Sequence, residues 1–599
     1  MLRADNFSLP GQPTHSPNID KLAKEGTLFT HAYVQYAYCS PSRNSFMTGR
    51  RPDTTKVWEF ADHFREVGVG KEWVSMPQYF KQFGYLTLGG GKLFHPSSGT
   101  ENIGMPWMDW PESWSPEYPY FFPKDDANVT TCADQGPFAL PPGSHPHKKF
   151  VWCEMEIDKD DNVTFGQLVR DNCVERLELA AANRSRPFFI GCGFHKPHAP
   201  HYAPREFYDA LPDWREVPLP VDMFAPVGMP TVAWHPYADV SGMVETPQFN
   251  GTVNHTRLHV YRRAYYASIA YTDYNIGVIV DKLDATPGLK DTTAVVVFGD
   301  HGYQLGEHDT WAKMTNVSPT ARDVALLKCC FAEVLLCVLQ FELGVHIPLI
   351  IRASWISSSV GKETGVLAEM VDMFPTLAEL AGLPDPRTVA GSEGINGTSL
   401  APAIADPSNS AALKPAAFSQ FSKNNIGTSV ACTFFRNATK LMGYTIRTHE
   451  WRYTAWFRFS FEGARGPYPT DAPDYFGRVL VDESLGTELC KIVMLSRFVA
   501  LSVSLTLKVS RLQTIIGGTR ASGWTGRART STSSTERSTP RSCRSCTASC
   551  STTSRSRATT PSFRPRALCA LALPASPSTR TRSCGWSGAP TRASTTCRA

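Results

Sequence analysis

Four apolar, strand-like segments of this chain each run directly into polar or ionisable residues. The segments are Thr27–Tyr38, Gly84–Gly89, Pro187–Phe194 and Thr293–Phe298. In sheets built from parallel strands with helical connections, the carboxyl ends of the strands meet at one edge and form ligand sites there. The repetition therefore predicts an α/β fold, a large mixed sheet flanked by helices, with a functional site assembled from the residues that follow the four strands.

These following residues carry reactive, cationic and metal-ligating groups. A Lys or His after a strand is by itself more often a solvated loop residue, and an Asp-His pair can be a turn and a helix cap. We therefore give weight to the order of these groups along the chain. In that order they are Cys39 and Arg43, then Lys92 and His95, then His198, and finally Asp300, His301 and Lys313.

The residues around Cys39 predict the N-terminus of a helix. Pro41 suits a first helical turn, and Ser42 can cap free backbone N–H groups. The positive end of that helix, together with Arg43, would create an anion site around residue 39. The plain alternative is a buried structural thiol.

The run Cys39–Arg43 reads Cys-Ser-Pro-Ser-Arg and is followed by Thr-Gly-Arg at residues 48–50. It resembles the signature of type I sulfatases, in which the Cys is oxidised to formylglycine by a formylglycine-generating enzyme before the enzyme works. The order of the other segments also matches this family. Runs such as Gly91–His95, His195–Pro200 and Met442–Thr448 are most similar to iduronate-2-sulfatase-like members.

The resemblance covers residues 1–490, apart from 317–340. It implies an alkaline-phosphatase-like fold, with a catalytic domain at 1–410 and a C-terminal subdomain at 411–490. Lys440–Arg458 alternates and is rich in aromatic residues, so it is similar to strands of the small antiparallel sheet that the family carries there.

The resemblance also implies a role for each candidate residue in hydrolysing a sulfate ester. Such a reaction needs a nucleophile, cations on the sulfate oxygens and an acid for the leaving group. Calcium would bind through oxygen ligands. By this resemblance, Cys39 as hydrated formylglycine is the nucleophile, and Arg43 and Lys92 hold it in place. His95 orients or deprotonates its hydroxyl group, while His198 and Lys313 bind the sulfate, with His198 as the acid. Asp300, His301 and residue 39 bind Ca²⁺.

The implied activity is sulfuric ester hydrolysis on sulfated sugars or polysaccharides. One alternative is a phosphonate or phosphate ester hydrolase of the same superfamily, because some of these share the nucleophile motif. A second alternative, from a different class, is an inactive protein that binds sulfated glycans, or a defective gene product. The loops that set specificity give no definite sugar.

Two segments do not read like the rest of the protein. Deleting 317–340 joins WAKMTN to FELGVHIPLI, a family-like run, and the segment's ends can be coded as a splice donor and acceptor. We interpret it as a retained intron; the alternative is a surface insertion. A similar splice donor at residues 490–491 and splice acceptor at residue 513 would shift the reading frame of the codons that follow. We therefore interpret 491–599 as an intron plus out-of-frame translation. Its alternative is a genuine basic disordered tail.

The charge of the chain limits the expected binding partners, and its glycosylation sequons indicate the cellular compartment. The net charge is +5, yet 491–599 holds 18 Lys and Arg against one acid, so the remaining body is acidic and predicts no nucleic-acid partner. No segment predicts a membrane span. Frequent glycosylation sequons favour a secretory, lysosome-like or extracellular location, although no signal peptide is visible. Sequons begin, among other positions, at Asn128, Asn162, Asn183, Asn250, Asn254, Asn396 and Asn437.

One departure from the family concerns calcium. The family's first strand ends in an Asp-Asp pair that supplies two ligands, shortly before the equivalent of Leu2-Arg3, and this sequence starts at Met1. Hard cations need several oxygen ligands, and a missing central strand leaves its neighbours' backbone groups unpaired. We therefore expect this 599-residue chain to bind Ca²⁺ poorly and to be inactive or unstable.

Overall fold

The computed structural model describes residues 14–59, 62–66, 70–96, 108–123, 152–155, 157–161, 164–220, 223–224, 234, 255–307, 310–313, 342–408, 413–423, 441–458, 480–481 and 487–491. The chain divides into two compact units, residues 1–501 and 502–599. All described residues belong to the first unit. The predicted intron 317–340 and nearly all of the predicted tail 491–599 lie outside the described residues.

The main sheet is mixed and has the strand order β10-β1-β9-β6. Strand β1 (Thr27–Tyr33) pairs in parallel with β10 (Lys362–Glu369) and antiparallel with β9 (His346–Arg352), which pairs antiparallel with β6 (Val295–Phe298). A second, parallel pair joins β2 (Leu86–Gly91) to β4 (Phe188–Gly193). The prediction of a large mixed α/β sheet is confirmed, and all four strand-like segments contain strands.

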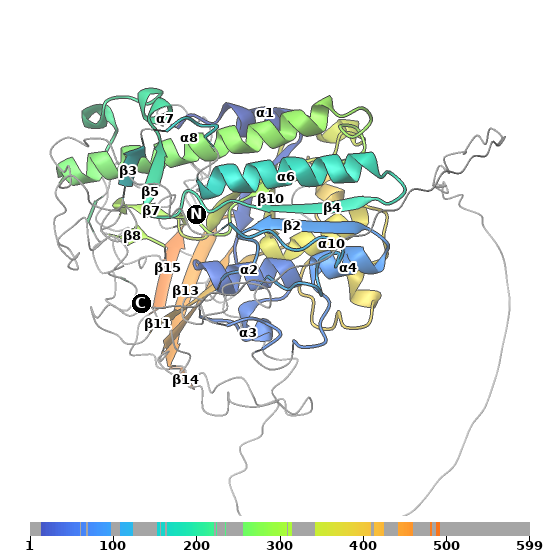
Figure 1. The fold of residues 1–599 in the computed structure, drawn as a ribbon. Coiled ribbons are helices and arrows are strands. Elements are labelled where there is room, and N and C mark those ends of the chain that lie inside the picture. The colour runs from blue at the N-terminus through green and yellow to red at the C-terminus, as the bar shows by residue number, and fades with distance from the viewer. Residues whose placement is uncertain are drawn as a thin grey trace, which may run out of the picture. The chain divides into compact units, whose positions relative to one another are not determined.

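Helices cover both faces of these strands (Figure 1). On one side lie α1 (Pro17–Glu25), α6 (Phe165–Ala182) and α8 (His255–Ala285), and on the other α2 (Cys39–Thr48), α4 (Met76–Gln82) and α10 (Met373–Leu380). Side chains alternate between the two cores because successive residues of a strand point to opposite faces. Val295 and Val297 accordingly pack on the α8 side, and Val296 and Phe298 on the α4 side.

Strands β4 and β6 pack against the same apolar cluster, which contains Leu177, Leu283 and Leu289. Within the described residues β4 pairs with β2 alone and β6 with β9 alone. The apolar side chains of both strands are half-buried. In this part of the molecule, each of the two strands therefore has one edge without a ladder partner.

The predicted small antiparallel sheet is also present and contains the segment that the sequence indicated. It runs β11 (Ala417–Lys423), β12 (Leu441–Arg447), β13 (Trp451–Arg458) and β14 (Leu480–Val481), with β15 (Thr487–Lys491) also on β13. It meets the main sheet where Gln420 N donates to Gln35 O, 2.9 Å away.

The remaining elements are short connections. No helix among the described residues is long and apolar enough to cross a membrane. These elements are α3 (Pro52–Thr55), α7 (Arg205–Asp209), α11 (Ala401–Ala405), β3 (Trp152–Met155), β5 (His201–Pro204), β7 (Gln304–Leu305), β8 (Trp311–Ala312) and the 3₁₀ turns Trp214–Glu216, Ser357–Ser359, Met370–Asp372 and Pro386–Thr388.

Candidate active site

Cys39 is the first residue of α2 and is fully buried. The helix therefore begins two residues before Pro41, and no side chain caps it. The predicted capping role of Ser42 is wrong, because the N-cap position is Tyr38 and Ser42 lies inside the first turn, where its N–H donates to Tyr38 O. The Ser42 hydroxyl instead donates to the backbone carbonyl of Asp300 at 2.5 Å, which fastens the start of α2 to the segment after β6.

Two lysines and a histidine surround the Cys39 sulfur. Lys92 Nζ, just after β2, and Lys313 Nζ, just after β8, each lie 3.7 Å from Sγ, and His301 Nε2 lies 3.2 Å from it. Burial raises the pKa of the Cys39 thiol, but the charges of Lys313, Lys92 and His301 outweigh burial and lower it to about 5. Burial lowers the pKa of Lys92 to about 8. The surroundings of residue 39 thus stabilise an anion.

Arg43 and Asp300 form a buried ion pair beside this group. Arg43 Nε and Nη2 lie 3.0 and 2.9 Å from Asp300 Oδ2. Arg43 also donates to the backbone carbonyls of Lys92 and Leu93. Burial would raise the pKa of Asp300, but the charges of Arg43 and His301 hold it well below its usual value. Arg43 therefore joins α2, the end of β2 and the end of β6.

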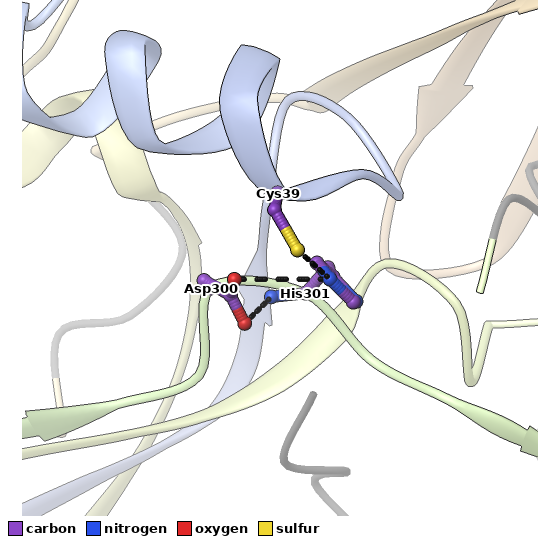
Figure 2. Close-up of side chains that lie close together, drawn as sticks. All are labelled: Cys39, Asp300 and His301. Atoms are coloured by element: carbon purple, nitrogen blue, oxygen red, sulfur yellow. Dashed lines mark hydrogen bonds and ion pairs between the residues drawn. The ribbon is translucent and has the colours of Figure 1, made fainter. Parts of the chain in front are cut away.

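The three predicted metal ligands lie together. Figure 2 shows the side chains of Cys39, Asp300 and His301 grouped between the start of α2 and the end of β6. One ligand atom from each lies within 4.8 Å of the others, and all three residues are buried. Calcium takes six to eight oxygen ligands, whereas this group, within the described residues, supplies one carboxylate. These residues fit one side of a calcium site and do not complete it.

His198 and Lys313 are in direct contact. Lys313 Nζ lies 3.0 Å from His198 Nε2, and His198 Nδ1 lies 2.5 Å from Ala199 O. A carbonyl oxygen can only accept, so Nδ1 carries the hydrogen and Nε2 accepts from the lysine. Burial and then the charges of Lys313 and Lys92 lower the pKa of His198 well below its usual value, which keeps the imidazole neutral.

The last predicted residue, His95, is half-buried at the end of the segment that follows β2. Burial, followed by the charges of Lys92, Arg43 and Lys313, lowers its pKa well below the usual value, so it belongs to the same group of charges. The structure also adds His195, whose ring lies 4.6 Å from that of His198. Its place in the His-Lys-Pro-His run was a signal that could have identified it.

Comparison with known proteins agrees with this arrangement. The family model described as Sulfatase matches residues 1–383. Iduronate 2-sulfatase of Mus musculus is 32% identical over 474 residues, covering 74% of this chain and 81% of that protein, and iduronate 2-sulfatase of Homo sapiens is 31% identical over 489 residues with the same coverage. The solved structure of the phosphonate monoester hydrolase SpPMH from Silicibacter pomeroyi superposes with a TM-score of 0.55 at 18% identity, covering 77% of this chain and 88% of that one. Its low identity makes it evidence of fold alone. The resemblance predicted from the motifs is confirmed: the chain belongs to the sulfatase family of hydrolases and has their alkaline-phosphatase-like fold.

Proposed function

We propose that this protein hydrolyses sulfate esters of sugars, with residue 39 as the nucleophile. The observation that carries the proposal is the position of Cys39, buried at the start of α2 with Lys92, Lys313 and His301 around its side chain. A sulfate group carries negative charge on its non-bridging oxygens, and cations fixed in a buried site stabilise such charge better than mobile water does. The sulfatase family model and the curated relatives support the same reaction.

Residue 39 would act after oxidation to formylglycine by a formylglycine-generating enzyme. The hydrate of that aldehyde carries two hydroxyl groups. One would attack the sulfur and form a covalent sulfate ester, as in other covalent mechanisms. Arg43 and Lys92 would hold residue 39, since Arg43 donates to the Lys92 carbonyl and Lys92 Nζ reaches the side chain of residue 39.

The pair of Lys313 and His198 would bind the sulfate and supply the proton for the leaving alkoxide. Because His198 Nδ1 donates to Ala199 O and Nε2 accepts from Lys313, the proton for the leaving oxygen would come from Lys313, either directly or after transfer to His198 Nε2. Neutral His95 would take the proton from the second hydroxyl of residue 39, which releases sulfate and restores the aldehyde.

Asp300, His301 and residue 39 would hold a divalent cation, for which we propose Ca²⁺ with further oxygen ligands from outside the described residues. When bound, the ion would add positive charge against the sulfate oxygens. The Asp300 carboxylate is ionised and suits this role, and His301 lies beside it.

The proposed substrates are sulfated sugars or polysaccharides, since two relatives carry the name iduronate 2-sulfatase. The proposed location is the secretory pathway, in a lysosome-like compartment or outside the cell. Two observations support it: a disulfide joins Cys173 of α6 to Cys192 of β4, and the sequon residue Asn183 is exposed. Disulfides persist in oxidising compartments. We propose that the protein is glycosylated there and has no nucleic-acid partner.

Paired substrates test the proposal against the phosphonate alternative. The full chain, supplied with excess CaCl₂ to offset the weak Ca²⁺ binding that its sequence predicts, is assayed on 4-nitrophenyl sulfate and 4-nitrophenyl phenylphosphonate after conversion of residue 39 has been verified by peptide mass spectrometry. We expect faster cleavage of the sulfate, and loss of that activity in Cys39→Ala. Faster cleavage of the phosphonate, or no cleavage of the sulfate by a folded and converted enzyme, would overturn it. A panel of sulfated disaccharides then identifies the sugar.

A further inference from the structure

A buried chain of polar aromatic side chains crosses α8 close to the candidate site. We propose that His201, Tyr261 and Tyr303 form a positioning device that holds the His198 loop and the Asp300–His301 segment in fixed relation to each other. The proposal rests on the proposed function, because it concerns residues that position the reacting groups. None of the three side chains belongs to the motifs that identify the family.

The first link is His201, the first residue of β5 and three residues after His198. Its side chain is fully buried, and Nε2 lies 3.0 Å from the hydroxyl of Tyr261 on α8. The imidazole ring contacts the rings of Tyr261, Tyr265 and Tyr303 edge-on, with centroids 4.9, 5.4 and 5.6 Å away. Burial, followed by the charges of Lys196 and Lys313, lowers the pKa of His201 well below its usual value, so the ring is neutral.

The second link joins α8 to the metal-side segment. The Tyr261 hydroxyl shares a short hydrogen bond with the hydroxyl of Tyr303, two residues after His301. The ring of Tyr303 stacks on that of Tyr265, 5.2 Å between centroids. On its other side Tyr303 N donates to Leu343 O at 2.7 Å. Next to Tyr261 on α8, Arg262 donates to the Leu305 carbonyl at 3.1 Å. The helix therefore holds this segment at several consecutive residues.

The polar groups of His201, Tyr261 and Tyr303 argue that these residues position their neighbours rather than only fill space. His201 Nδ1 is buried and has no hydrogen-bond partner among the described residues, which costs stability. An apolar ring would fill the same space without that cost. Buried polar networks select one arrangement of their members, because any other arrangement leaves further groups unpaired. The arrangement selected here fixes His198, which contacts Lys313, relative to Asp300, which contacts Arg43.

Removing one hydroxyl tests the device with little change in packing. In the full converted enzyme, Tyr261→Phe removes the hydroxyl group that contacts both His201 and Tyr303. The matched control is Tyr271→Phe on the same helix, whose buried hydroxyl lies 2.6 Å from Thr164 Oγ1 at the start of α6. We measure kcat and KM on 4-nitrophenyl sulfate, thermal unfolding, and amide hydrogen exchange in peptides that cover 195–204 and 299–305.

For Tyr261→Phe we expect kcat to fall about tenfold with KM changed less than about twofold, as for a small misplacement of reacting groups. We also expect faster exchange in both peptides. Tyr271→Phe should lower stability to a similar extent and leave kcat and both peptides unchanged. The double variant Tyr261→Phe/Tyr303→Phe should lose no more activity than Tyr261→Phe, since the two hydroxyls act as a unit.

The outcomes separate this inference from the proposed function. Equal behaviour of the two single variants, or an additive double variant, overturns the positioning device even if the enzyme is an active sulfatase. If the folded wild-type enzyme cleaves no sulfate, the proposed function fails, and the exchange data alone decide the inference. Faster exchange in both peptides for Tyr261→Phe but not for Tyr271→Phe then supports it, and unchanged exchange overturns it.

Discussion

Replacing Lys313 by Met should raise the pKa of the unconverted Cys39 thiol by several units. The Lys313 ammonium lies 3.7 Å from Cys39 Sγ, and its charge is the largest of the influences that lower the pKa of the thiol to about 5 against the effect of burial. Methionine keeps the length and apolar stem of the side chain and removes the charge. The thiolate then loses one of its two lysine partners and keeps Lys92.

The size of the shift follows from the distance. Two unit charges ~4 Å apart interact by about 4 kcal/mol at an effective dielectric constant of ~20. One pKa unit corresponds to ~1.4 kcal/mol, so the change is ~3 units. Removing a positive charge disfavours the thiolate, and the pKa of Cys39 should therefore move from about 5 upward to ~8.

The assay is a pH titration of thiolate ultraviolet absorbance, on protein made without the formylglycine-generating enzyme. Subtracting the same titration of Cys39→Ala removes the other cysteines and the tyrosines. The matched control is Lys196→Met, because Lys196 is also buried but donates to the carbonyls of His198 and Pro200. A midpoint that shifts by less than ~1 unit in Lys313→Met, or equally in both variants, would refute the electrostatic account.

Three further predictions concern pH, stability and modification. In the converted enzyme, kcat/KM should fall as pH rises through about 8, because Lys92 loses its charge there. The fall should begin somewhat below that pH, since conversion removes the Cys39 thiolate, whose charge raises the pKa of Lys92. A pH profile that stays flat to pH ~10 would contradict this. Lys414→Met should cost ~3–5 kcal/mol in urea unfolding, since it leaves buried Glu369 and Asp372, 2.8 and 2.7 Å from Nζ, without that partner. The control Lys21→Met removes an exposed pair with Asp281 and should cost under ~1 kcal/mol, and equal losses would count against the argument. Asn183→Gln should remove one glycan from secreted protein, because Asn183 is exposed. Asn396→Gln should remove none, because Asn396 is half-buried and held against residues 49–51, with its N–H donating to Gly49 O at 2.8 Å and its Oδ1 accepting from Arg51 N at 3.0 Å; a glycopeptide at Asn396 would disprove this second half.

The sequence predicted the sheet and the set of residues around Cys39 because both depend on local patterns. Lys92 and His198 follow the paired strands β2 and β4, and Asp300 follows β6 of the main sheet. The carboxyl ends of strands that run in parallel bring such residues together. The start of α2 was predicted less well. A serine near a helix start suggests a cap, but Ser42 lies inside the first turn, and its hydroxyl is taken by a carbonyl 258 positions away.

Long-range polar contacts lay beyond the reach of sequence patterns. Tyr261 meets both His201 and Tyr303 because α8 runs for 31 residues past β5 and the segment after β6. Nothing in the spacing of those aromatic residues distinguishes them from ordinary core residues. The Arg43–Asp300 ion pair is similar, since each residue had a predicted role and neither pattern indicated the other as its partner.

Charge at the candidate site leads to a last prediction about calcium. With residue 39 converted to neutral formylglycine, Arg43, Lys92 and Lys313 bring three positive charges against the one carboxylate of Asp300. That carboxylate is already paired with Arg43. A divalent cation entering beside these groups meets like charge, whereas a sulfate group meets opposite charge. In the part of the chain described, the site therefore favours the anion over the cation.

Calcium should consequently bind weakly to the converted chain alone and more tightly once sulfate is present. By linkage, sulfate must raise calcium affinity by the same factor as calcium raises sulfate affinity. Isothermal titration with CaCl₂ in the presence and absence of sodium sulfate, and with Asp300→Asn as control, measures both factors. Tight calcium binding without any anion, at Kd near 1 μM or about −8 kcal/mol, would show that additional carboxylates complete the site and that the local charge does not decide the affinity.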